Sequence, residues 1–152
     1  MEQTKPESSD KFVRGSSRFT RAEPDIPTNV PQYRGLEVIA LTGEVHEKIA
    51  QYANRFLKKG DRVLDLGCGS GALCLRLADL GFATTGCDGL SEAFKLHGSV
   101  PFYATDLNGP FAEVFPEKFD GIVATEIIEH VENPRNFIRQ CRKLLIPGGN
   151  CF

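Results

Sequence analysis

The fold of this 152-residue chain is decided by the stretch Val63-Leu64-Asp65-Leu66-Gly67-Cys68-Gly69-Ser70-Gly71. Its first four residues form a short, mostly apolar run that stops at a glycine, as is typical of a buried β-strand. Three alternating glycines follow, and glycine allows a sharp turn and a close approach of another group to the backbone. Leucines at 73, 77 and 80 then recur at helical spacing, and Gly81 is expected to end that helix. A strand, a glycine turn and a helix indicate a nucleotide site at the carboxyl end of the first strand of an α/β sheet.

The same turn fits two kinds of nucleotide cofactor. Gly67, Gly69 and Ala72 match a dinucleotide fingerprint, and Asp88 follows at about the ~20-residue distance expected for a ribose-binding acid. Asp65 opposes that interpretation, because its carboxylate would lie close to a pyrophosphate and repel it. S-adenosylmethionine carries a cationic ammonium and a cationic sulfonium instead, and both suit an acid at this position. We favour the methyl donor. The alternatives are an NAD-dependent oxidoreductase and a turn that only packs a helix on a strand.

The composition is typical of a soluble globular protein. Hydrophobic residues make up 41% and charged residues 25% of the chain, and the formal net charge is −2. This balance favours neither nucleic acid nor an anionic membrane surface as a partner. No signal peptide and no apolar run of membrane-spanning length is apparent, so we expect a cytoplasmic protein without membrane insertion. Four basic residues cluster late in the chain, and we interpret them as a solvated helix face: Arg135, Arg139, Arg142 and Lys143.

The chain has five cysteines, an odd number, and no pair shows Cys-x-x-Cys spacing. All five lie in apolar or strand-like runs, which favours buried, reduced thiols over a disulfide framework or a metal site. Cys68 lies within the glycine turn, so it is the one cysteine expected to contact a ligand.

The sequence divides into a polar segment and one domain. Residues 1–32 lack periodicity and predict a flexible tail, whereas residues 33–152 predict the folded domain. Strands are expected at 62–66, 83–87, 101–105 and 119–124. Helices are expected at 44–59, with Tyr52 and Phe56 on the apolar face, at 72–80, and after Asn133, with Ile138 in the apolar stripe. A short helix is expected after Ser91 and a helical turn at 111–115. This alternation predicts an α/β fold, a Rossmann-like and mostly parallel sheet with flanking helices.

A fifth strand is expected to begin only at Cys151, and we therefore expect the fold to be truncated at the start of that strand. The fourth strand would then keep an open apolar edge, through which a dimer could form.

Five motifs, in this order, resemble the class I S-adenosylmethionine-dependent methyltransferase family over roughly residues 44–152. They are the glycine stretch 63–71, the segment 85–91 that contains Asp88, the segment 104–107 that contains Asp106, the segment 124–131 with the sequence Ala-Thr-Glu-Ile-Ile-Glu-His-Val, and the segment 144–149. The fourth motif is similar to that of small-molecule methyltransferases, including the ubiquinone-pathway O-methyltransferases.

The resemblance implies a role for each motif residue. Asp88 would accept hydrogen bonds from the ribose hydroxyls, and Leu90 would cover one face of the adenine. Asp106 would accept from the adenine amino group, and the backbone of Leu107 would add a second adenine contact. Glu126 would contact the methionyl part of the cofactor. Together with the residues of the glycine turn, the candidate cofactor-binding set is Asp65, Gly67, Cys68, Gly69, Gly71, Asp88, Leu90, Asp106, Leu107 and Glu126, and no metal site is expected.

Methyl transfer from a sulfonium is an in-line displacement, so the protein mainly positions the two reactants. A base is needed only if the acceptor must lose a proton, and His130 is the candidate catalytic residue because histidine can accept a proton near neutral pH. Glu126 and Glu129 are alternatives, and His130 could instead be purely structural. The chain lacks an Asn-Pro-Pro-Tyr-type motif after the fourth strand, so we expect a small-molecule acceptor and O- or C-methylation. A domain that binds the cofactor without activity is a further alternative.

Overall fold

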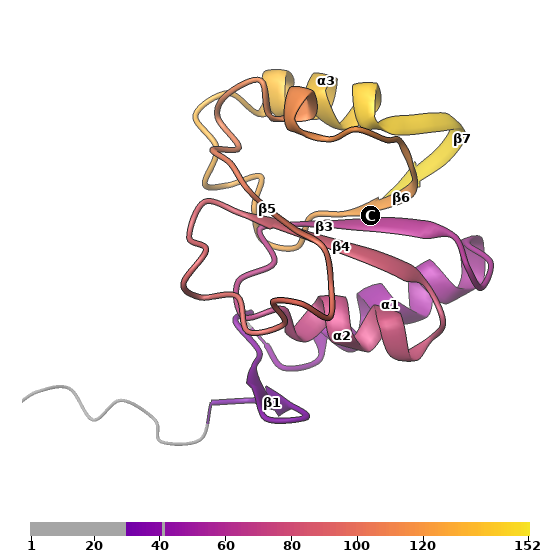
Figure 1. Ribbon diagram of the computed structural model, residues 1–152, viewed down its shortest axis with the longest axis vertical. Helices are drawn as coiled ribbons and strands as arrows, with labels where there is room; N and C mark the ends of the chain where they lie inside the picture. The colour runs from indigo at the N-terminus through magenta and orange to yellow at the C-terminus, as the bar shows by residue number, and fades with distance from the viewer. Residues whose placement is uncertain (1–29, 41) are drawn as a thin grey trace, which may run out of the picture.

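The structure, a computed structural model, describes residues 30–40 and 42–152. Figure 1 shows a parallel sheet between two layers of helices. The elements are β1 (Gln32–Tyr33), β2 (Leu36–Glu37), α1 (Val45–Phe56), β3 (Arg62–Leu66), α2 (Ala72–Asp79), β4 (Ala83–Asp88), β5 (Phe102–Ala104), the 3₁₀ turn η1 (Phe111–Val114), β6 (Phe119–Val123), α3 (Pro134–Leu144) and β7 (Leu145–Cys151). Most of the expected tail lies outside the described residues. Its last residue, Gln32, already belongs to the antiparallel β1–β2 hairpin.

The main sheet has the order β5-β4-β3-β6-β7, and every neighbouring pair of strands is parallel. The chain enters the sheet at its centre with β3, adds β4 and β5 on one side, and then crosses to add β6 and β7 on the other. A parallel sheet whose strand order reverses in this way has a crevice outside the carboxyl ends of its central strands. The predicted α/β, Rossmann-like fold is therefore confirmed.

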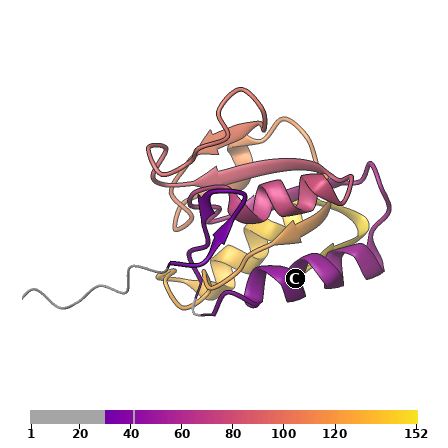
Figure 2. The same cartoon turned by 90° about the horizontal axis from the view of Figure 1, so that it is seen from below.

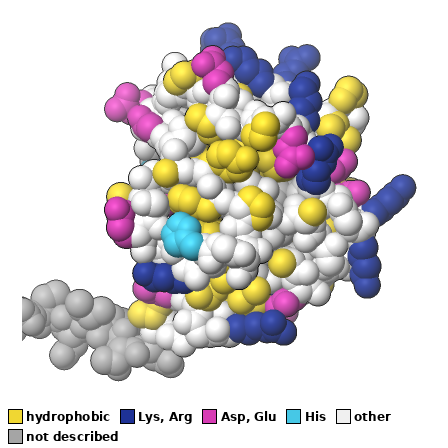
Figure 3. Space-filling view, in the orientation of Figure 1, with side chains coloured by type: hydrophobic (Ala, Val, Ile, Leu, Met, Phe, Trp, Pro, Cys, Tyr) yellow, Lys and Arg dark blue, Asp and Glu magenta, His cyan; other side chains and the backbone are white. Residues whose placement is uncertain are grey.

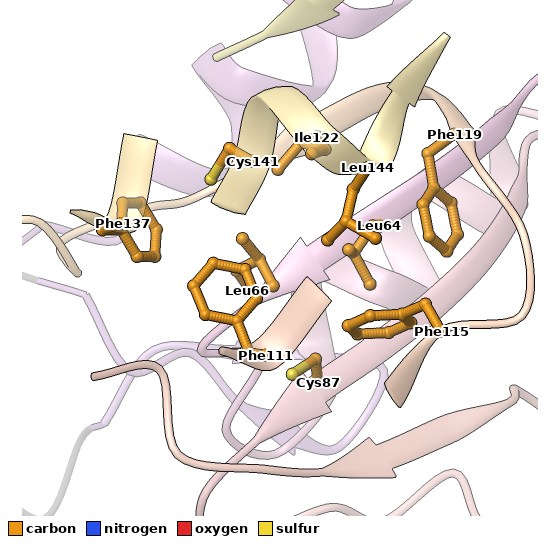
Figure 4. Close-up of a cluster of buried hydrophobic side chains, with 10 residues drawn as sticks. All are labelled: Leu64, Leu66, Cys87, Phe111, Phe115, Phe119, Ile122, Phe137, Cys141 and Leu144. Atoms are coloured by element: carbon orange, nitrogen blue, oxygen red, sulfur yellow. The ribbon is translucent and has the colours of Figure 1, made fainter. Parts of the chain in front are cut away.

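The alternating side chains of β3 divide the core into two layers. Leu64 and Leu66 face α3 and η1, where they pack among aromatic side chains (Figure 4). Val63 faces the opposite side and packs with residues of α1 and α2. Figure 2 shows these two helices side by side against the sheet. Asp65 follows the same alternation as Val63, which points its carboxylate toward α2.

The expected apolar faces of two helices are partly wrong. α1 ends at Phe56 rather than at residue 59, and Tyr52 and Phe56 are 53% and 55% exposed. α1 instead packs through its small alanines, Ala50 and Ala53, whose short side chains let it lie close to α2. In α3, Ile138 is 52% exposed, and the four clustered basic residues lie on the outer face. Lys and Arg side chains accordingly gather over this helix at the top of Figure 3.

The start of α3 is as expected. The side chain of Asn133 accepts a hydrogen bond from the backbone N–H of Asn136, and Pro134 is the first helical residue. The short helix expected after Ser91 does not form. Phe94 N–H bonds back to the Ser91 carbonyl, but the next N–H, of Lys95, donates to the Ser70 carbonyl in the glycine turn. Because the Lys95 N–H is used in that bond, the helical hydrogen-bond pattern does not continue beyond one turn.

The fifth strand begins earlier than expected. β7 starts at Leu145 and pairs with β6, with an irregularity between the Phe119–Leu145 and Gly121–Asn150 pairs that accommodates the Pro-Gly-Gly segment 147–149. The β6 edge that the sequence left open is therefore covered by this chain, and a dimer through a sheet edge stays an untested prediction.

The structure also bears on two expectations, one about the cysteines and one about membrane-spanning segments. All five cysteines are free thiols, and four are buried, whereas Cys151 is exposed. Among the described residues, no helix is long and apolar enough to cross a membrane.

Candidate functional site

Two adjoining cavities lie at the carboxyl ends of the central strands. The first has a volume of about 300 Å³, and the second, of about 480 Å³, shares Leu90, Ile127 and His130 with it. Nine of the ten predicted cofactor residues line these two cavities. Asp65, Gly67, Cys68, Gly69, Asp88 and Glu126 line the first, Asp106 and Leu107 line the second, and Leu90 lines both. Together, the two cavities form one cleft.

The glycine turn forms the floor of the first cavity. The N–H groups of Gly67 and Cys68 both donate to the Cys87 carbonyl, at 2.7 and 3.1 Å, which ties the turn to β4. Gly67 has a φ of +74°, and a Cβ there would overlap the side chain of Ile127. Gly71 lies outside the cavity lining. It begins α2 with a φ of +89°, and a Cβ there would lie only 2.9 Å from Phe94. Gly71 therefore serves packing, whereas Gly67 and Gly69 border the cavity.

Asp88 is held in place by two backbone groups. Its Oδ2 accepts from the Gly69 N–H and its Oδ1 from the Leu90 N–H, both at 2.9 Å. Each carboxylate oxygen has more than one lone pair, so both can still accept from a ligand hydroxyl. Asp88 thus caps the turn through its backbone hydrogen bonds and keeps lone pairs that a ligand could use.

Asp106 repeats this arrangement one strand further along the sheet. It is exposed, and its Oδ1 accepts from the Asn108 N–H at 2.9 Å. Asp106 and Leu107 border the second cavity, which places them together but apart from the glycine turn.

Asp65 is the most deeply buried acid of the site, with 2% of its surface exposed. Its Oδ2 accepts a hydrogen bond from the Cys74 thiol at 3.3 Å. Burial, with a smaller contribution from the negative charge of Asp88, raises the pKa of Asp65 from 3.8 to about 7. The ionised form of Asp65 therefore lacks sufficient stabilisation from the protein, and a cation in the cavity would supply it.

Glu126 follows β6 in an unusual backbone conformation. Its φ is +53°, a left-handed value that residues with a side chain seldom adopt. Such strained residues cluster at functional sites, where the surrounding structure holds a side chain in position. Here the strained residue borders the first cavity.

His130 is exposed and borders both cavities, and its backbone N–H donates to the Ile127 carbonyl at 2.9 Å. Glu129, an alternative candidate for the base, borders neither cavity. The position of His130 between the two cavities suits either a base or a residue of the acceptor pocket.

Sequence reasoning missed several residues of the first cavity. His46 is 6% exposed on α1, and its Nδ1 is buried without a hydrogen-bond partner, as is the hydroxyl of Thr125. Glu37 and Ile39 come from the hairpin region, which is fastened to the glycine turn by a hydrogen bond from the Ser70 hydroxyl to the Glu37 carbonyl. A signal for His46 was available, because it is a polar residue on the buried face of the helix just before β3.

The charges of the cleft have one sign. Five acids border it, namely Glu37, Asp65, Asp88, Asp106 and Glu126, together with two histidines. Among the described residues that border either cavity, none is a lysine or arginine. The cleft is therefore suited to a ligand with cationic groups and opposes a pyrophosphate.

Comparisons with known proteins agree with this geometry. The family model described as "Methyltransferase domain" matches residues 41–152. Among curated relatives, the ubiquinone biosynthesis O-methyltransferase of Dechloromonas aromatica is 41% identical over 101 residues, and that of Proteus mirabilis is 36% identical over 100 residues. Each match covers 61% of this chain. It covers 43% of the Dechloromonas aromatica protein and 41% of the Proteus mirabilis protein, so this chain spans less than half the length of these relatives.

Solved structures show the same fold. A putative methyltransferase from Bacillus halodurans superposes with a TM-score of 0.58 at 22% identity, covering 70% of this chain and 48% of the other. Coclaurine N-methyltransferase, solved with N-methylheliamine and SAH, also gives 0.58, at 24% identity, covering 74% of this chain and 36% of the other. The family match decides between the two cofactors that the glycine turn left open. The chain belongs to the methyltransferase-domain family, whose cofactor is S-adenosylmethionine.

Proposed function

We propose that this domain binds S-adenosylmethionine in the two-cavity cleft and transfers its methyl group to a small-molecule acceptor. The observation that carries the proposal is the charge of the cleft, which has five acids and, in the described part of the chain, no lysine or arginine. S-adenosylmethionine has two cationic groups and no phosphate, so it matches this charge. A nicotinamide dinucleotide would place two phosphates beside Asp65 and Asp88.

The individual residues fit the parts of the cofactor. Asp88 is already oriented by two N–H groups and would accept from the ribose hydroxyls. Leu90 is 67% exposed between the cavities and would cover the adenine, with Asp106 and Leu107 beside it in the second cavity. Asp65 and Glu126 would face the cationic ammonium and sulfonium groups. Gly67 and Gly69 border the first cavity, so the bound cofactor would lie against the backbone of the turn.

When bound, the cofactor supplies a methyl group that is already activated for displacement. The protein would then orient the acceptor in line and exclude water, and would remove a proton if the acceptor is a hydroxyl group. His130 is the proposed base, because it borders both cavities and can reach a ligand from either. The names of the curated relatives favour oxygen as the methylated atom, and C-methylation is the second candidate.

Calorimetric titration of the chain with S-adenosylmethionine and with NAD⁺ tests the donor. We expect micromolar binding of S-adenosylmethionine and none of NAD⁺. Asp88→Asn should weaken binding about 10-fold or more, since hydrogen bonds to charged groups contribute about 1.5–3 kcal/mol. The matched control is Glu92→Gln, an exposed acid close to Asp88 in sequence that borders neither cavity. NAD⁺ binding without S-adenosylmethionine binding would refute the proposal.

Transfer of a radiolabelled methyl group to a panel of catechols, phenols and other small hydroxyl compounds tests the acceptor class. With an accepted substrate, His130→Gln should lower kcat at least 10²-fold and leave cofactor affinity unchanged, as expected for loss of a base. Glu129→Gln, on the same turn but outside both cavities, is the control. Full activity of His130→Gln would remove His130 from the mechanism.

A further inference from the structure

Two buried polar atoms border the first cavity and lack a partner within the protein. They are the Nδ1 of His46, at the start of α1, and the hydroxyl oxygen of Thr125, just after β6. A buried polar group without a hydrogen bond destabilises the protein, so such groups are uncommon unless a ligand or water satisfies them. Their position on the wall of one cavity points to a ligand group that carries hydrogen-bond acceptors or donors.

His46 could pair with an anionic ligand group if its ring gained a proton. Arg76, from α2, and Glu126, from the segment after β6, are the charged residues that act on this imidazole. Burial is the main reason that its pKa lies below 6.5, with Arg76 lowering it further and Glu126 opposing this. In the unliganded cavity His46 is therefore mainly neutral at pH 7. An anion beside it would favour the protonated ring, whose two N–H groups are both donors.

Asp65 presents the opposite situation on the same cavity. The groups that act on it are the Cys74 thiol, from α2, and the carboxylate of Asp88, after β4. Neither is a cation. The buried carboxyl group holds its proton up to near neutral pH, and a ligand cation would release that proton.

We propose that His46 and Asp65 form a pair of ionisable groups matched to the zwitterionic amino-acid end of the methyl donor, with His46 gaining a proton beside the ligand carboxylate and Asp65 losing one beside the ligand ammonium. The inference rests on the proposed function, because it takes the amino-acid end of the donor as the ligand group. The hydroxyl of Thr125 adds a neutral hydrogen bond to the same end. The chain thus provides its own cation for the carboxylate in a cavity without lysine or arginine among its described lining residues.

This assignment determines how many protons are exchanged when the ligand binds. One proton leaves Asp65, one proton is taken up by His46, and the ligand keeps both of its own charges. The two changes have opposite signs in a proton count, so they partly cancel in the wild-type protein. Removing either residue should therefore expose the contribution of the other.

Calorimetric titration with S-adenosylhomocysteine in buffers of different ionisation enthalpy measures the protons exchanged on binding. This probe has the same amino-acid end as the donor and no sulfonium. At pH 7 we expect His46→Gln to release up to about half a proton, since the pKa of Asp65 is about 7. Asp65→Asn should take up protons, and the wild type should lie between the two variants.

Two controls isolate the amino-acid end. 5′-Methylthioadenosine lacks that end, so its binding should give the same proton count in the wild type and in His46→Gln. His97→Gln replaces an exposed histidine that borders neither cavity, and it should leave the count with S-adenosylhomocysteine unchanged. Thr125→Val should weaken binding of S-adenosylhomocysteine several-fold without changing the number of protons exchanged.

A second readout follows the imidazole directly. The ring ¹³C and ¹⁵N chemical shifts of His46, assigned by their loss in His46→Gln, should move to imidazolium values with S-adenosylhomocysteine and not with 5′-methylthioadenosine. A folded His46→Gln variant with the wild-type proton count, or a His46 ring that stays neutral in the complex, would overturn the inference. If the wild type binds neither compound, the proposed function fails instead, so the two failures are distinguishable.

Discussion

Replacing Asp65 by asparagine should stabilise the domain while weakening its ligand site. The amide can still accept from the Cys74 thiol but carries no charge to desolvate. The raised pKa means that the native state binds the Asp65 proton more tightly than the unfolded chain does. This contribution to stability is complete below pH 3.8 and is lost as the pH rises to about 7.

The size of the effect follows from the two pKa values. A change from 3.8 to about 7 corresponds to about 4 kcal/mol between the low-pH and high-pH limits. Between pH 5 and pH 8 the stabilisation by Asp65→Asn should increase by about 2–3 kcal/mol. For a domain of this size that is about 5–10 °C in Tm. Urea unfolding followed by circular dichroism, at half-unit pH intervals, measures it.

Glu129→Gln is the control, because this glutamate is exposed and its replacement should change the stability only slightly. A stabilisation by Asp65→Asn that does not change between pH 5 and pH 8 would refute the argument from burial. So would a destabilisation that grows with pH. Ligand affinity should fall in the stabilised variant, as expected where a residue is kept for function at the expense of stability.

Three further predictions concern the turn, the strained residue and the hairpin. Glu126→Gly should stabilise the fold by about 1 kcal/mol through relief of the left-handed φ, whereas Glu126→Gln should not, and both should weaken cofactor binding in titrations. Gly67→Ala should destabilise by at least about 2 kcal/mol, and adding Ile127→Ala should recover only the part due to overlap, as a double-mutant cycle in urea would show. Ser70→Ala should remove the bond to the Glu37 carbonyl and raise amide exchange across residues 32–38, and unchanged exchange would mean that the bond does not hold the hairpin.

The sequence was sufficient where one local signal determines the structure. The stretch 63–71 predicted β3, its turn and α2, and Asn133 with Pro134 predicted the start of α3, because strand ends and caps depend on neighbouring residues. The acids that end β4 and follow β5 were placed at the correct edge of the sheet, since all carboxyl ends of parallel strands meet there.

The sequence was insufficient where tertiary packing decides. Tyr52 and Phe56 fit an apolar helical face, but α1 packs through alanines, so the large side chains point outward. The short helix after Ser91 was lost to a backbone bond from Lys95 to the glycine turn, 25 residues earlier in the chain. His46 joins the site because α1 packs beside α2 and brings its first turn to the first cavity, a tertiary arrangement that the glycine motif itself does not indicate.

A crystal structure of the chain with S-adenosylhomocysteine tests the central claim most directly. We predict the ribose hydroxyls on Asp88, the adenine in the second cavity near Asp106, and the amino-acid end in the first cavity between Asp65 and His46. A ligand bound outside the two cavities, or bound in the opposite direction with its adenine beside Asp65, would contradict the account.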